Sequence, residues 1–338
     1  MRCCEVLCLL MGWTLAGVVG CSGLPKDESI VRYVKDVDPE TGTTYYLAVP
    51  TAHTADKKWS LIVTCHGTPL WDTALQQIGR WGHLAGDQGV VVVAPRLKGT
   101  ASDKLFPIVS RQIAKQEQDE RVILSLVERL KPAYNIDPAR VFLTGWSGGS
   151  YAVLFTGLRH PEVFRALAVH QGNFDERFLE PVTSRLNPYQ PVQMSYGYTD
   201  PLKTQAKDAM KWLRKHRMAY AVPQELTGHH RLLPQVAHDF FRRCVREYPW
   251  IVVTAQASRP DELMAVKFRV RSSPPAVEHF WRFGDGSIAR TPSPEHLYTK
   301  EGTFDVQVTL KIESGRQFVR TIRVTVPIAQ IGVAAGST

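Results

Sequence analysis

The stretch VFLTGWSGGSYAVLF, residues 141–155, begins as an apolar strand and ends as an apolar helix. Between the two lie Gly145, Ser147 and Gly149, so a single hydroxyl stands in a glycine-rich corner. Glycines are needed in so tight a turn because a side chain there would collide with neighbouring backbone. A serine on such a turn stands above the sheet, where the free N–H groups of the next helix point outward. The pattern favours a nucleophilic Ser147 over a purely structural turn.

Strands and helices alternate on both sides of this corner. KWSLIVTC and VVVVAP precede it as strands, and ALAVHQG, PVQMSYGY and AVPQELTG follow it, with helical segments between them. A continuous apolar run such as VVVVAP is typical of a parallel strand that is buried on both faces. Residues 43–248 are therefore predicted to form an α/β domain, a mostly parallel sheet with helices on both faces.

The pattern changes at about Pro249. From there to Pro327 the helical periodicity disappears, and short alternating segments such as LMAVKFRVRS and FDVQVTLKI are separated by turn residues. Such segments predict a small all-β sandwich over residues 249–327. The last residues, 328–338, are expected to be a disordered tail.

The first 21 residues, MRCCEVLCLLMGWTLAGVVGC, have the positive start and apolar run of an export signal. The ending VVGC resembles a bacterial lipobox, with Val18 where leucine is usual, which implies lipidation of Cys21. An ordinary signal peptide or a short membrane anchor is the alternative. We expect an exported protein held at the cell envelope by an N-terminal lipid on a bacterial membrane, with residues 22–42 as a linker.

Composition excludes several classes of function. Once the signal is removed, only Cys65 and Cys244 remain, and both lie in apolar runs, which predicts free, packed thiols. No metal-ligand spacing is present, so no metal or other cofactor is expected. The net charge is +9, but the basic residues are mixed with acidic ones and form no basic stripe, so no nucleic-acid partner is expected.

A serine nucleophile needs a histidine to accept its proton and a carboxylate to orient that histidine. In a parallel sheet such groups lie on loops after the strands. PVQMSYGYTDPL offers Asp200, which is either the catalytic acid or a helix cap, and AVPQELTGHH offers His229 and His230. The order Ser147, Asp200, histidine is that of enzymes with this serine turn. We favour His229, because Gly228 before it gives the loop freedom, and we leave His230 as the alternative.

The tetrahedral intermediate also needs hydrogen-bond donors aimed at its oxyanion. The backbone N–H of Gly148, directly after the nucleophile, is one candidate. The second is expected from the loop HGTPLW, which follows the strand LIVTC, and Thr68 is the predicted donor. His66 and Gly67 are expected to hold that loop in place.

Residues 43–248 resemble the α/β-hydrolase fold, in the branch of polyhydroxybutyrate depolymerase-like and feruloyl or acetyl-xylan esterases. The matching segments are LIVTCHG, VVVVAP, YNIDPARVFLTGWSGGS, YGYTDP and the GH of LTGHH. Ser150 stands where that branch often has a second glycine, and the cysteine pattern of secreted depolymerases is absent. Residues 249–327 resemble a PKD domain, through FWRFGDGS and HLYTKEGTFDVQVTL, with Trp281 and Tyr298 as core anchors.

These features predict an exported serine esterase that forms an acyl-enzyme, on an ester substrate that is soluble, polymeric or linked to a polysaccharide. A serine peptidase of the same fold is one alternative. Another is a degenerate envelope protein whose sandwich binds a polymer. The sandwich contains no acid–base constellation, so it is expected to be a structural or binding module.

Overall fold

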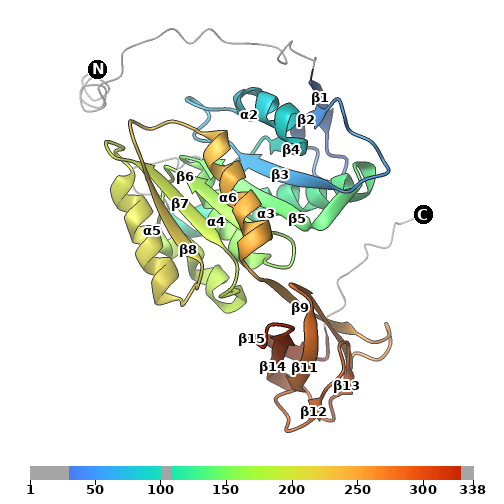
Figure 1. Ribbon diagram of the computed structural model, residues 1–338. Coiled ribbons are helices and arrows are strands. Elements are labelled where there is room, and N and C mark those ends of the chain that lie inside the picture. Colours follow the sequence, from blue (N-terminus) through green and yellow to red (C-terminus); the bar gives the residue numbers. More distant parts are fainter. Residues whose placement is uncertain (1–29, 101–107, 329–338) are drawn as a thin grey trace.

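The computed structural model describes residues 30–100 and 108–328. Figure 1 shows two bodies joined by one crossing of the chain. The larger body is built on an eight-stranded sheet in the order β1-β2-β4-β3-β5-β6-β7-β8. Its strands are β1 (Val31–Val37), β2 (Thr44–Pro50), β3 (Trp59–Cys65), β4 (Val90–Pro95), β5 (Ile136–Trp146), β6 (Ala166–His170), β7 (Val192–Gly197) and β8 (Ala221–Leu226). The neighbours from β4 to β8 in this order are all parallel, whereas β2 pairs antiparallel with both β1 and β4.

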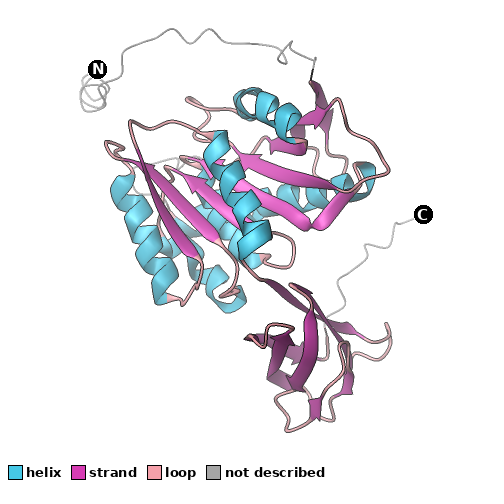
Figure 2. Cartoon of the chain, in the orientation of Figure 1, coloured by secondary structure: helices cyan, strands magenta, loops and turns pink. Residues whose placement is uncertain are grey.

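Helices cover both faces of this sheet, as Figure 2 shows in cyan. They are α2 (Ala74–Gln88), α3 (Val109–Ala133), α4 (Gly149–Arg159), α5 (Lys203–Lys215) and α6 (Pro234–Glu247), with the 3₁₀ helix η1 (Glu176–Arg185). Apolar side chains of α3, α4 and α5 share one core with one face of the sheet, and those of α2 and α6 share a second core with the other face. The central strands are apolar on both sides for this reason. The predicted α/β class is confirmed.

The expectation that residues 22–42 form a linker is wrong for β1, which pairs with β2 along its whole length. Val31 and Tyr33 are buried, while Arg32, between them, is exposed. One-sided burial is typical of an edge strand. Its sequence, VRYVKDV, carries three charged residues. These charges obscure the alternation of apolar and polar positions by which a strand is predicted.

The smaller body is an antiparallel sandwich of a three-stranded sheet, β13-β10-β9, and a four-stranded sheet, β12-β11-β14-β15. Its strands are β9 (Trp250–Ala257), β10 (Ala265–Ser273), β11 (Ala276–Arg282), β12 (Ile288–Ala289), β13 (Glu295–Leu297), β14 (Gly302–Ile312) and β15 (Gln317–Val326). Trp281 and Tyr298 lie in its core, as predicted, and the Tyr298 hydroxyl donates to Phe283 O at 3.0 Å.

The sandwich contacts the sheet domain at the loop before β7. Asn187 Nδ2 donates to Ile251 O at 2.9 Å, and the backbone N–H of Val319 donates to the Tyr189 hydroxyl at 3.2 Å. Arg320, which is buried, donates to Leu186 O at 3.3 Å. This loop enters β7, so the sandwich lies at the amino ends of the parallel strands, away from the loops that follow their carboxyl ends.

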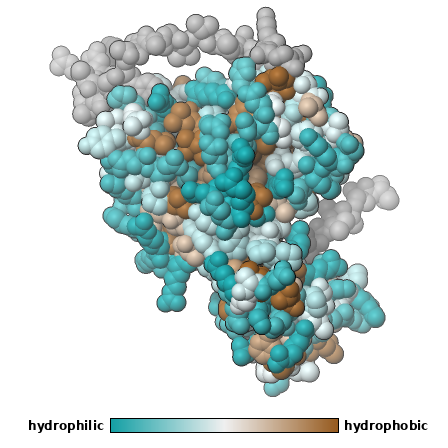
Figure 3. Space-filling model, in the orientation of Figure 1, coloured by the Kyte–Doolittle hydropathy of each residue, from teal (hydrophilic) through white to brown (hydrophobic). Residues whose placement is uncertain are grey.

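Cys65 and Cys244 are free and buried, as predicted, and they belong to the cores on opposite faces of the sheet. The signal segment, the lipidation site Cys21 and residues 329–338 lie outside the described residues. Among the helices of the described residues, none is long and apolar enough to cross a membrane. The surface in Figure 3 is mainly hydrophilic, with smaller apolar patches between the polar areas.

Candidate active site

Ser147 lies on a sharp turn between β5 and α4, with a φ of 53°. This left-handed conformation is uncommon for a residue other than glycine, and it is a form of backbone strain that concentrates at functional sites. The neighbouring glycines are sterically required. A β-carbon added at Gly148 would overlap Thr100 O, and one at Gly149 would overlap Cys65 O. The turn therefore keeps Ser147 in an imposed conformation at the carboxyl end of β5.

Asp200 and His230 meet on the loops after β7 and β8. His230 Nδ1 lies 3.2 Å from Asp200 Oδ1 and 3.1 Å from Oδ2. The carboxylate is fully shielded from solvent, and it also accepts a hydrogen bond of 2.7 Å from the N–H of Leu202. Asp200 thus caps the following turn and orients a histidine at the same time. The two roles expected for it, helix cap and catalytic acid, are therefore compatible.

The prediction that His229 pairs with Asp200 is corrected by this geometry. His229 is exposed, and its Nδ1 lies 3.0 Å from the Thr199 hydroxyl. Gly228 does loosen the loop, with a φ of 99°, but the turn it makes directs His229 outward and the next residue, His230, toward Asp200. The freedom of a glycine alone did not determine which of two adjacent side chains faces inward.

Gln171 holds the backbone on both sides of His230. Its Nε2 donates to His229 O at 2.9 Å, and its Oε1 accepts from the N–H of Arg231. Gln171 is buried directly after β6 and has a φ of 49°. One side chain therefore fixes the two peptide groups that flank the histidine.

The ring of Trp146, the residue before the nucleophile, connects the two halves of the site. It packs against the His230 ring, with ring centroids 4.9 Å apart and planes tilted by 33°. Within the described residues, His230 and the Ser147 hydroxyl form no hydrogen bond. Catalytic hydrogen bonds are often long in the absence of substrate and shorten in the bound complex.

The side chain of Thr68 lies next to Gly148, the residue that follows the nucleophile. The Thr68 Oγ1 atom is 3.2 Å from the position that a β-carbon on Gly148 would take. The N–H of Gly67 is already engaged, because it donates to Asp72 Oδ2 at 2.7 Å. The amides of Thr68 and Gly148 are therefore the donors at this corner that remain candidates for an oxyanion.

His66 anchors the loop that carries Thr68. Its Nε2 accepts from the N–H of Leu97 at 2.9 Å, so the ring proton is on Nδ1, which donates to Gly67 O at 2.7 Å. Burial lowers the pKa of His66, which keeps the ring neutral in this structural role. The expectation that His66 and Gly67 hold the loop agrees with these contacts.

His170, at the end of β6, is a buried structural histidine. Its Nδ1 lies 3.1 Å from the Ser195 hydroxyl, and burial lowers its pKa to about 4.

Among residues 30–100 and 108–328, no group of three or more histidine, cysteine or acidic side chains is arranged to hold a metal ion.

Sequence reasoning missed two parts of the site, Gln171 and the Trp146–His230 contact. Gln171 follows an apolar strand, which is the position that marked the other site residues. It was overlooked because its partners are 58 and 60 residues further along the chain.

Comparison with known proteins agrees with this division of the chain. Residues 81–227 match the prolyl oligopeptidase family, and residues 247–326 match the PKD domain. Poly(3-hydroxyalkanoate) depolymerase C of Paucimonas lemoignei is 29% identical over 110 residues, which are 32% of this chain and 26% of the relative. Dipeptidyl-peptidase 5 of Porphyromonas gingivalis is 26% identical over 147 residues, which are 43% of this chain and 21% of the relative. The chain thus aligns with about a quarter of the length of these curated relatives.

Similar solved structures include S-formylglutathione hydrolase of Staphylococcus aureus, with a TM-score of 0.48 at 13% identity over 65% of this chain and 97% of the other. A ferulic acid esterase of Anaeromyces mucronatus has a TM-score of 0.49 at 12% identity, over 64% and 91%. Together with the sheet order and the strand-to-helix serine turn, the family matches show that this chain has an α/β-hydrolase fold followed by a C-terminal PKD domain.

Proposed function

We propose that this protein is a serine hydrolase of carboxylic esters, with Ser147 as nucleophile, His230 as general base and Asp200 as the carboxylate that orients the base. The main support is the Asp200–His230 pair, at 3.1 Å, on the same edge of the sheet as Ser147. The left-handed conformation of Ser147 and the glycines around it add to this support.

In the proposed reaction, Ser147 Oγ attacks the ester carbonyl while its proton passes to His230 Nε2. Asp200 accepts a hydrogen bond from Nδ1–H and stabilises the imidazolium. The negative charge on the carbonyl oxygen is stabilised by the N–H groups of Gly148 and Thr68. His230 then protonates the departing alkoxide, which leaves an acyl group on Ser147. Water, activated by the same histidine, releases the acid and regenerates the enzyme.

Peptide hydrolysis is the second candidate, and the match of residues 81–227 to the prolyl oligopeptidase family favours it. The same catalytic groups serve both reactions, and they differ in the leaving group. An alkoxide leaves more readily than an unprotonated amide nitrogen, so ester cleavage demands less of the site. The rim exposes large apolar side chains at Leu70, Trp71 and Tyr198, on loops after β3 and β7, and these are available to either kind of substrate.

The test is hydrolysis by the full chain of p-nitrophenyl esters of increasing acyl length and, in parallel, of short peptide anilides, with Ser147→Ala as the control. The proposal predicts ester turnover and fluorophosphonate labelling that both disappear in Ser147→Ala. Peptide turnover above ester turnover would favour the peptidase. No turnover and no labelling in the unmodified protein would favour a degenerate binding protein.

We further propose that the chain is exported and anchored through a lipid on Cys21. The support is the signal-like sequence of residues 1–21. Mass spectrometry of the N-terminal peptide from membrane fractions tests it, with Cys21→Ala as the comparison. A protein that retains residues 1–21, or that lacks lipid, would contradict the anchor.

A further inference from the structure

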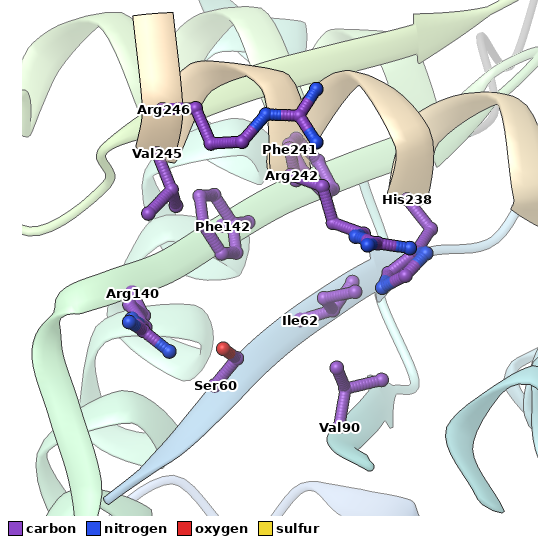
Figure 4. Close-up of a pocket in the computed structure, with 10 residues that line it drawn as sticks. All are labelled: Ser60, Ile62, Val90, Arg140, Phe142, His238, Phe241, Arg242, Val245 and Arg246. Atoms are coloured by element: carbon purple, nitrogen blue, oxygen red, sulfur yellow. The ribbon is translucent and has the colours of Figure 1, made fainter. Parts of the chain in front are cut away.

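A cavity lies between α6 and the sheet, and it is shown in Figure 4. Its volume is about 220 Å³. That is the volume of about seven water molecules in the liquid, and less than the roughly 300–1,000 Å³ typical of pockets for drug-sized ligands. The cavity therefore suits a small molecule.

The floor of this cavity is apolar and its rim is basic. Buried side chains of β3, β4, β5 and α6 form the floor: Ile62, Val90, Phe142 and Phe241. Exposed guanidinium groups stand around the rim, one from β5 and two from α6: Arg140, Arg242 and Arg246. Among the described residues, no acidic side chain lines the cavity.

The rim charge is incompletely neutralised. Arg140 has Asp137 at 3.4 Å, and Arg246 has Glu247 at 3.6 Å. Arg242 forms no ion pair with any of the described residues. Figure 4 shows the side chain of Arg242 extending toward the ring of His238. A positive rim with one guanidinium that has no ion-pair partner attracts an anion. A guanidinium group can donate two parallel hydrogen bonds to the oxygens of a carboxylate or phosphate.

His238 adds a polar group at the cavity wall. It is 4% exposed, and its Nδ1 has no hydrogen-bond partner among the described residues, with Asp239 Oδ1 at 4.0 Å. Burial lowers the pKa of His238, so the ring is neutral. Buried polar atoms are normally hydrogen-bonded, and an unpaired one at a cavity wall is accounted for by a ligand or water.

We propose that this cavity binds a small anionic amphiphile, with its apolar chain on the floor formed by Ile62 and Phe142 and its anionic head between Arg242 and Arg246. A simple inorganic anion would leave the apolar floor uncovered. Burial of the floor adds to the free energy of binding only when an apolar group covers it, so an amphiphile is the better ligand. The basic rim repels cationic amphiphiles and offers neutral ones no charged partner, so both bind more weakly than an anionic one.

The cavity is separate from the proposed active site. Ser60 and Val90 lie at the beginning of β3 and β4, whereas Ser147 follows the end of β5. Phe142 precedes Ser147 by five residue steps along β5 and its end, which is about 16 Å at the usual rise of a strand. Binding here therefore does not depend on the chemistry proposed for Ser147.

Calorimetric titration of the full chain with octanoate below its micellar concentration tests the proposal. We expect one saturable site, weakened about tenfold or more in Arg242→Ala and in Arg246→Ala, because each variant removes a charged hydrogen-bond donor. Arg243→Ala is the matched control. That guanidinium lies on the same helix but stacks over Phe240 and Tyr248, outside the cavity, so its loss should leave affinity unchanged.

Ser60→Phe fills the cavity without changing its charge and is expected to abolish binding. Octanol, which lacks the anionic head, is expected to bind at least tenfold more weakly than octanoate. Equal octanoate affinity in Arg242→Ala and Arg243→Ala would overturn the proposal, as would equal binding of octanol. Loss of octanoate binding after fluorophosphonate labelling would place the ligand at Ser147 instead. Arg242-dependent binding to anionic vesicles, without binding of monomeric octanoate, would indicate a membrane-contact surface.

Discussion

Replacing Gln171 with alanine should show whether this residue positions the proposed base, His230, or only contributes to the stability of the fold. The change removes the donor to His229 O at 2.9 Å and the acceptor of the Arg231 N–H, and so frees both peptide groups beside His230. It leaves the backbone strain as it was, because alanine at a φ of 49° has the same β-carbon clash as glutamine. Any change therefore comes from the two lost hydrogen bonds and from the space that the buried side chain leaves.

Each bond contributes about 1 kcal/mol, and the freed groups can reach water because His229 and Arg231 are exposed. We therefore expect a loss of about 1–2 kcal/mol in the free energy of unfolding. The effect on turnover should be larger, since a displacement of about 1 Å in a catalytic group can cost about 100-fold. A fall of about 10- to 100-fold in kcat is predicted, with KM changed by less than about twofold.

Gln190→Ala is the matched control. Gln190 is also buried and donates two hydrogen bonds to backbone, to Gly157 O at 3.0 Å and Phe164 O at 2.8 Å, on the other side of the sheet domain from the site. Ester kinetics and urea unfolding are measured for both variants. Similar destabilisation in both, with a loss of kcat only in Gln171→Ala, is the predicted result. If both variants lose kcat by the same factor, or neither does, the positioning role is refuted.

Two further predictions follow from local geometry. Gly148→Ala should lower kcat by about 100-fold or more and cost about 1–3 kcal/mol in thermal unfolding, because the new methyl group overlaps Thr100 O; near-normal activity would contradict the tight turn. Burial alone lowers the pKa of His160, but hydrogen bonds to Glu120 and Glu162 raise it to about 9. The protonated ring therefore stabilises the fold fully below pH 6.5, and this is lost as the pH rises through about 9. In His160→Gln, the fall in unfolding free energy between pH 6.5 and 9 should shrink by about 1–2 kcal/mol, as measured by urea titration; an unchanged slope would refute the assignment.

The parts of the fold that sequence predicted are those that local pattern determines. The serine turn, the parallel strands and the core anchors of the sandwich each depend on residues within one short segment. Glycines 145, 148 and 149 are read directly from the sequence, and each would clash if it carried a β-carbon.

The features that the sequence did not predict depend on contacts between distant segments. The choice between His229 and His230 is made by a carboxylate 30 residues earlier and by the side chain of Gln171. The β1 strand is an edge strand, whose exposed positions carry charge, so its alternation is weak without its partner β2. Neither the choice of histidine nor the β1 strand is determined by local propensity. Patterns within short segments therefore do not predict them.

The two adjacent histidines give the most direct test of the proposed mechanism. We would measure kcat/KM for p-nitrophenyl acetate in His230→Gln, His229→Gln and the unmodified full chain, with circular dichroism as the check on folding. We predict a loss of at least about 1,000-fold in His230→Gln and a change of less than about threefold in His229→Gln. Full activity in His230→Gln, or the larger loss in His229→Gln, would contradict the proposed Ser147–His230–Asp200 triad.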